Sequence, residues 1–348
     1  MRCNVFGNTT EDILQPYDNP VKNQVRSWGF RSLDRSFPTE LAGKHALYLP
    51  GEQNLEGPLF AERNMIAHPV EHSRAVLHRL SNPRVSRHPL KRRQVFFGSL
   101  GEAILYHAQR GTPRLAMVSA DFEGKVDTCA EELIDLFRIF PERDGGFLNV
   151  TTFANLDGQS VEDGIVFTNI FNNLLAGEVK RGMEKLYAQL LKYLTKHAQP
   201  EKILCHAQIC RDFSLLWRIL LGIILFDHPQ ETPGTVDVSR HAQITQLVGE
   251  MHRESLSILL RTGHSTSMRF FQQRGLVELF ERYRTTILPV SLERILYKSQ
   301  GHNRMSTWFL SFGRLHGEIP LTDVANQLWQ LYSLSPLVYI NEGKPEIY

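Results

Sequence analysis

The sequence predicts an α/β protein with a doubly wound, mostly parallel sheet of seven strands, a C-terminal antiparallel hairpin and an inserted helical subdomain. Between about residues 44 and 154, short apolar runs alternate with stretches whose apolar residues recur at helical spacing. Near residues 294–312, two apolar runs flank a short polar turn, which is typical of a hairpin. The hairpin would supply the last two strands.

Five strands are expected in the first block, each short and closed by a turn residue, an acid or a helix. They are expected at 45–49, 65–67, 94–97, 115–119 and 147–153, with helices at 71–80, 100–108 and 128–140. The connections are long enough for crossovers, which favours parallel pairing with helices on both faces of the sheet.

Beyond about residue 177 the strand pattern stops and helical periodicity replaces it. Helices are expected at 178–197, 213–226, 239–260 and 269–286, followed by hairpin strands at 294–299 and 305–312. We therefore divide the chain into a helical or irregular N-terminal segment, 1–43; a sheet domain, 44–176; a helical insertion, 177–288; and a C-terminal hairpin that completes the sheet, with a tail, 289–348. The insertion is expected to lie over the carboxyl ends of the strands as a lid or substrate-recognition element.

Composition limits the classes of function. The 39 basic and 37 acidic residues leave a formal charge of +2, so the molecule as a whole is not a basic protein that would bind nucleic acid over its entire surface. Four scattered cysteines suggest a reducing cytoplasm. The longest apolar run, 215–226, contains Arg218 and is too short to span a membrane. Cys205, His206 and Cys210 lack a fourth ligand, so no metal is expected.

This order of elements resembles the class I S-adenosylmethionine-dependent methyltransferase fold over roughly residues 44–175 and 288–316. The resemblance implies S-adenosylmethionine as cofactor and methyl transfer as activity. The acceptor is not named by the sequence, and a nucleic acid or a protein is favoured over a small molecule. In the turn at residues 49–57, Gly51 and Gly57 replace the family's dense glycine cluster. The alternative is a catalytically inactive module of the same fold that binds nucleic acid or a protein partner.

The resemblance also implies a set of cofactor-binding residues, namely Pro50, Gly51, Glu52, Glu71, Ser99 and Leu100. Glu71 would accept hydrogen bonds from the ribose hydroxyls, or it would stabilise the start of the next helix. Ser99 would face the adenine, or it would cap the helix that follows.

Asp121 and Glu123 follow the fourth strand, where ligands bind in open α/β sheets. A carboxylate there could take a proton from the methyl acceptor. Alternatively, these acids cap a helix that begins near residue 127.

A basic cluster precedes the third strand and contains Arg84, Arg87, Lys91, Arg92 and Arg93, with no acid among them. Such a cluster can hold the phosphates of a nucleic acid. The alternative is a solvated charged loop.

Overall fold

The sheet contains nine strands in the computed structural model, which describes residues 19–37, 41–122, 124, 129–154, 200–227, 281, 283–298, 304–341 and 344–347. The strands are β1 (His45–Tyr48), β2 (Ile66–Glu71), β3 (Phe96–Phe97), β4 (Met117–Asp121), β5 (Gly146–Phe153), β6 (Arg284–Lys298), β7 (Arg304–Pro320), β8 (Leu337–Asn341) and β9 (Lys344–Ile347). Their order is β3-β2-β1-β4-β5-β7-β6-β8-β9.

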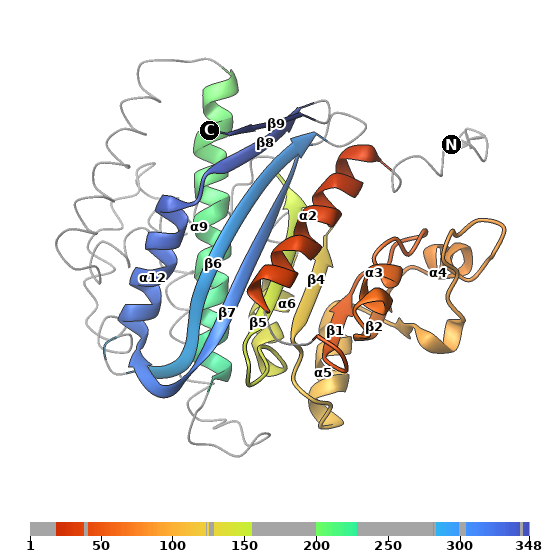
Figure 1. Ribbon diagram of the computed structural model, residues 1–348, viewed down its shortest axis with the longest axis horizontal. Helices are drawn as coiled ribbons and strands as arrows, with labels where there is room; N and C mark the ends of the chain where they lie inside the picture. Colours follow the sequence, from red (N-terminus) through yellow and green to blue (C-terminus); the bar gives the residue numbers. More distant parts are fainter. Residues whose placement is uncertain are drawn as a thin grey trace, which may run out of the picture.

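The predicted topology is confirmed. Strands β1 to β5 pair in parallel, and β7 runs antiparallel between β5 and β6 (Figure 1). Two strands beyond the predicted seven extend the sheet, because β8 pairs in parallel with β6 and β9 returns antiparallel to β8. The order β3-β2-β1-β4-β5 is that of doubly wound nucleotide-binding sheets.

Helices cover both faces of the sheet. The described helices are α2 (Pro20–Ser36), α3 (Gly57–Glu62), α4 (Arg74–Leu80), α5 (Leu100–Gln109), α6 (Ala130–Asp135), α9 (Pro200–Phe226) and α12 (Leu321–Leu334). Residues of α2 and α3 share one core with the sheet, whereas residues of α5, α6, α9 and α12 share the other. None of the described helices is both long and apolar enough to cross a membrane.

Alternation along the strands separates the two cores. In β4, Met117 belongs to the core on the α2 face, whereas Val118 and Ala120 belong to the core on the α9 face. Because side chains alternate along a strand, Ser119 and Asp121 lie on the α2 face with Met117. This alternation determines that Ser119 and Asp121, rather than Val118 and Ala120, face α2 near the carboxyl edge of the sheet.

Two predicted boundaries near β2 and β6 are wrong. The helix expected from residue 71 begins at Arg74, because Glu71 still pairs with Phe97 in the sheet and Ser73 caps the helix. The strand expected from residue 294 begins at Arg284, within the range expected to be helical, because β7 continues to Pro320 and pairs with this earlier segment. Tertiary pairing outweighs the local pattern at both places.

Helix α9 begins at Pro200, before the predicted start at residue 213, and its apolar residues from Leu215 to Phe226 are buried in the core on the α9 face of the sheet. It lies across one face of the sheet (Figure 1). The predicted helices 178–197 and 239–260, most of 269–286, the turn 300–303 and Glu123 lie outside the described residues.

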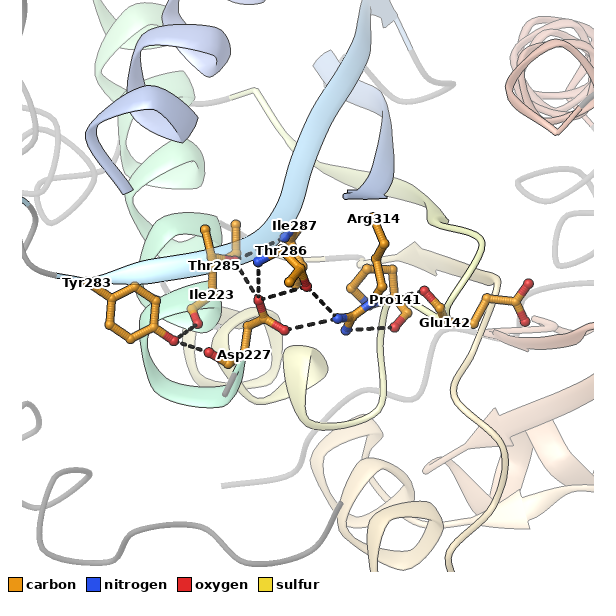
Figure 2. Close-up of polar contacts among 9 residues, drawn as sticks. All are labelled: Pro141, Glu142, Ile223, Asp227, Tyr283, Thr285, Thr286, Ile287 and Arg314. Carbon is orange, nitrogen blue, oxygen red and sulfur yellow. Dashed lines mark hydrogen bonds and ion pairs between the residues drawn. The ribbon is translucent and has the colours of Figure 1, made fainter. Parts of the chain in front are cut away.

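A buried polar network fastens the end of α9 to β6 and β7 (Figure 2). The Asp227 carboxylate accepts hydrogen bonds from the Thr285 hydroxyl and, at 3.0 Å, from the backbone N–H of Thr286. It also forms an ion pair with Arg314, at 3.1 Å. The Tyr283 hydroxyl donates to backbone carbonyls of the last helical turn. The network joins the first residues of β6 to the end of α9.

Candidate functional site at the carboxyl edge

Asp121 is the last residue of β4 and lies at the carboxyl edge predicted for the site. Its Oδ2 is 3.5 Å from the Lys22 Nζ of α2, and its side chain is 26% exposed. Its Oδ1 is buried and accepts no hydrogen bond from the described part of the chain. One carboxylate oxygen of Asp121 is therefore held by a cation and the other is left to accept a hydrogen bond.

Glu56 is a second acid at this edge, and sequence reasoning did not select it. It lies in the turn between β1 and α3 and is buried. Burial raises its pKa from 4.5 to about 7, against the lowering effects of Arg26, Ser119 and Lys22, while nearby Asp121 raises it further. Its Oε2 also accepts no hydrogen bond from the described residues. Glu56 therefore changes charge near neutral pH.

Polar side chains from neighbouring strands surround these two acids. Asn149 of β5 donates a hydrogen bond of 2.9 Å to the Ser119 hydroxyl of β4. Tyr297 of β6 is buried, which raises its pKa, as do the nearby carboxylates of Asp121 and Glu56. The carboxyl edge on the α2 face therefore carries a polar cluster built from the turn after β1, two central strands, β6 and α2.

The turn after β1 contains the predicted cofactor residues Pro50, Gly51 and Glu52. Gly51 has φ of 57° and Asn54 has φ of 49°, both in the left-handed region. Glu52 is buried and pairs with Arg79 at 2.5 Å. The backbone of the turn supplies the bend that the resemblance implies, but the Glu52 carboxylate is directed to α4.

Two further side chains of this turn hold the segment between α4 and β3. Gln53 donates to the Val85 carbonyl at 3.2 Å and accepts from the Arg87 N–H at 3.1 Å. Asn54 donates to the His88 carbonyl at 3.0 Å. The basic cluster predicted from the sequence is therefore fastened directly to the turn after β1.

Glu71 ends β2 and is buried. Its Oε1 accepts a hydrogen bond of 2.7 Å from the Ser73 N–H. Its place at the end of the second strand is the one that the resemblance implies for a ribose-binding acid.

Ser99 and Leu100 begin α5. The Ser99 hydroxyl accepts from the Glu102 N–H at 3.1 Å, and Glu102 accepts from the Ser99 N–H at 2.7 Å. This is a complete capping box. Leu100 is buried in the core. The capping role that the sequence left open for Ser99 is present, and contact with an adenine stays a prediction.

The described residues contain no group of three or more His, Cys, Asp or Glu side chains that could hold a metal ion. The side chains of Cys205, His206 and Cys210 are outside the described set.

Sequence reasoning placed Asp121 at the carboxyl edge, where the structure has it, but did not select its neighbours Glu56, Lys22, Arg26 and Tyr297. The sequence could have indicated Glu56, since it is a carboxylate within the turn at residues 49–57 that follows the first predicted strand. Lys22 and Arg26 had none, because residues 1–43 carried no expected contact with the sheet. Their approach depends on α2 packing across β5, β6 and β7.

The strand order and the hairpin of β6 and β7 agree with the class I methyltransferase resemblance at the level of the fold. No protein-family model matches the sequence, and no curated protein matches it.

Solved structures with similar folds include a sugar N-methyltransferase from Streptoalloteichus, with 15% identity and a TM-score of 0.31 over 45% of this chain and 60% of that protein. A cyclopropane synthase from Mycobacterium tuberculosis has 12% identity and a TM-score of 0.31 over 83% and 84% of the two chains. A Haemonchus contortus phosphoethanolamine N-methyltransferase, solved with S-adenosyl-L-methionine, has 12% identity and a TM-score of 0.29 over 89% and 61%. These values are too low to indicate what this chain binds.

Proposed function

We propose that this protein is an S-adenosylmethionine-dependent methyltransferase whose acceptor is a nucleic acid or a protein rather than a small molecule. The observation that carries the proposal is the pair of acids at the carboxyl edge, Asp121 and Glu56, each with a buried oxygen that accepts no hydrogen bond from the described residues. In open α/β sheets, ligands bind at this edge. A ligand with N–H or O–H donors, or with a positive charge, would satisfy both oxygens.

An adenosyl cofactor has both hydrogen-bond donors and a positive charge, so the acids at this edge fit it. The proposed binding residues are Pro50, Gly51, Glu52 and Leu100, through their backbone, and Glu71 and Ser99, through their side chains. When bound, S-adenosylmethionine supplies an electrophilic methyl group. The Asp121 carboxylate, and Glu56 above its pKa of about 7, match its positive charge.

Asp121 is the proposed base, with Glu123 beside it in sequence. Lys22 lies 3.5 Å from Oδ2 of Asp121, which leaves Oδ1 to orient the acceptor and take its proton. Glu56, whose pKa is about 7, tunes the charge of this edge. The chain's part in the reaction is alignment and proton removal.

The first test is a thermal-shift titration with S-adenosylmethionine and S-adenosylhomocysteine. A ligand that binds only the native state raises the melting temperature with concentration. No shift with either compound at millimolar concentration contradicts the proposed cofactor.

The cofactor residue with the clearest expected effect is Glu71. Glu71→Ala removes a carboxylate expected to accept from ribose hydroxyls, which should weaken adenosyl-ligand binding by about 1.5–3 kcal/mol. Calorimetry measures the dissociation constant, and Glu62→Ala on α3, whose side chain is 67% exposed, is the matched control. An unchanged constant in a variant that melts normally assigns Glu71 to the local turn alone.

For Asp121, the expected result is a loss of turnover without a loss of cofactor affinity. Asp121→Asn should lower methyl transfer from labelled S-adenosylmethionine to total RNA or to mixed protein by roughly a hundredfold to ten-thousandfold. Unchanged turnover removes Asp121 from the proton-transfer role.

A catalytically inactive module is the second candidate, and one observation favours it. Glu52, Gln53 and Asn54 are buried side chains in the turn where the resemblance implies glycines. If neither adenosyl compound binds while a nucleic acid or protein does, this candidate replaces the enzyme. A cytoplasmic location is part of both proposals.

A further inference from the structure

The β3 edge of the sheet carries an unusual concentration of positive charge. From His72 to Gly101 the sequence contains no Asp or Glu but seven basic residues: Arg74, Arg79, Arg84, Arg87, Lys91, Arg92 and Arg93. All of these except Arg79 are exposed. Figure 1 shows α4 and the chain leading to β3 at the end of the sheet opposite α12. The whole molecule is nearly neutral, but this end of the sheet carries a local excess of positive charge.

Two exposed aromatic rings at this end of the sheet each lie beside an arginine: Phe97 beside Arg74 of the cluster, and Tyr106 beside Arg110 at the end of α5. Phe97 of β3 is 45% exposed and Tyr106 of α5 is 37% exposed. The Arg74 guanidinium lies 5.9 Å from the Phe97 ring centroid, and the Arg110 guanidinium lies 4.6 Å from that of Tyr106. Phe96 packs against Tyr106 with ring centroids 5.2 Å apart. The sequence alone did not place aromatic rings beside this cluster, whereas the tertiary structure does.

The rings lie on both sides of a short edge strand. Side chains alternate along β3, so Phe96 faces α5 and Phe97 faces the opposite side with Arg74. Since β3 is the terminal strand and has two residues, no further strand of the described sheet covers it. The surface therefore wraps around an edge, with a ring and an arginine on each side.

The basic segment is held in place by the hydrogen bonds of Gln53 and Asn54 to Val85, Arg87 and His88. Arg92 adds a contact of 3.2 Å to His78 of α4. Three acids of the neighbouring segments have partners of their own: Glu52 pairs with Arg79, Glu71 accepts from Ser73, and Glu102 accepts from Ser99. A preformed basic surface of this kind loses less entropy on binding than a free loop.

We propose that the β3 edge, formed by Phe97, Tyr106 and the exposed cations from Arg74 to Arg93, binds single-stranded nucleic acid. Cations neutralise phosphates, and aromatic faces stack on bases that are not paired. A duplex offers phosphates but keeps its bases stacked on each other, so the exposed rings favour a single strand. The inference goes beyond the proposed methyl transfer, because an enzyme and an inactive module would both use this surface.

The test is fluorescence anisotropy with the full chain and no cofactor, so that its outcome is independent of methyl transfer. The probes are labelled 20-residue oligouridine and oligothymidine strands and a labelled 20-base-pair duplex, each measured over a range of salt concentrations. Either single strand should bind at least about tenfold more tightly than the duplex. Tighter binding of either strand than of the duplex supports the proposal, because unpaired bases are common to both strands and absent from the duplex.

Two sets of variants separate stacking from charge. Phe97→Ser with Tyr106→Ser should weaken single-strand binding roughly tenfold with little change in its salt dependence. Replacing Lys91, Arg92 and Arg93 by Ser should reduce the salt slope by about 2–3. The matched controls are Leu334→Ser, an exposed apolar residue on α12, and the triple Ser variant of the exposed cations Arg31, Arg143 and Lys298.

Equal binding of duplex and single strand, or equal losses in the control variants, overturns the proposal. Absence of oligonucleotide binding at low salt also overturns it, as does binding only to phosphatidylserine vesicles. Each variant must melt like the parent chain, and Phe97→Leu provides a second variant that keeps an apolar side chain but removes the ring.

Discussion

Replacing Glu56 with Gln should make the protein more stable at pH 8 and leave its stability nearly unchanged at pH 4.5. The carboxyl group is buried at the carboxyl edge, and burial raises its pKa from 4.5 to about 7. Gln has nearly the same shape but cannot ionise. The variant therefore removes the cost of a buried negative charge without opening a cavity.

The direction follows from proton binding. Between pH 4.5 and about 7 the folded protein holds a proton on Glu56 that the unfolded chain has released, so the stability of the parent chain falls as pH rises through this range. The change is complete above about pH 7. The two pKa values differ by an amount worth about 3 kcal/mol, which is the largest stabilisation expected for Glu56→Gln at pH 8.

The assay is urea denaturation of the parent chain and the variant at pH values from 4.5 to 8. Other groups titrate in both proteins, so the difference between their free energies of unfolding isolates Glu56. Glu62→Gln on α3, with a side chain that is 67% exposed, is the control and should show no comparable pH-dependent gain. A difference that is constant with pH, or a variant less stable than the parent at pH 8, would refute the inferred burial cost.

Two further predictions concern stability. His45 and His68 have ring nitrogens 2.8 Å apart, and burial, His107 and His45 lower the pKa of His68 from 6.5 to about 4. The folded ring thus binds a proton less readily than the unfolded one, so the free energy of unfolding falls as pH falls from 6.5 towards 4. His68→Gln should therefore lose less stability than the parent chain between pH 7.5 and 5 in the same urea assay. Equal losses in the two proteins would rule this out. Asp227→Ala should lower the free energy of unfolding by about 3–5 kcal/mol, since it removes the ion pair with Arg314 and the acceptor of the buried Thr285 hydroxyl and of the Thr286 N–H, whereas exposed Asp323→Ala on α12 should cost less than about 1 kcal/mol. A small loss for Asp227→Ala in thermal and urea melts would mean that the network does not hold α9.

Local pattern determined the order of the elements along the chain. Short apolar runs separated by helical patterns were enough to predict five parallel strands, and a polar turn between apolar runs was enough to predict the hairpin of β6 and β7. Asp121 could be selected in the same way, because the sequence alone shows where a predicted strand ends and which residue stands there. Alternation along a strand is a property of the backbone, so these features do not require knowledge of distant partners.

Only the tertiary structure determined the length and number of the C-terminal strands, the pKa of Glu56 and the surroundings of the exposed rings. β6 gained ten residues because β7 extends far enough to pair with them, and β8 and β9 joined the sheet because the edge of β6 is available. The pKa of Glu56 rises to about 7 only because the tertiary structure encloses the side chain, which removes water from its carboxyl group. Phe97 and Tyr106 are separated in sequence from most of the arginines they accompany. The positions of these rings beside arginines depend on how β3 packs against α4 and α5, and no local pattern contains that packing.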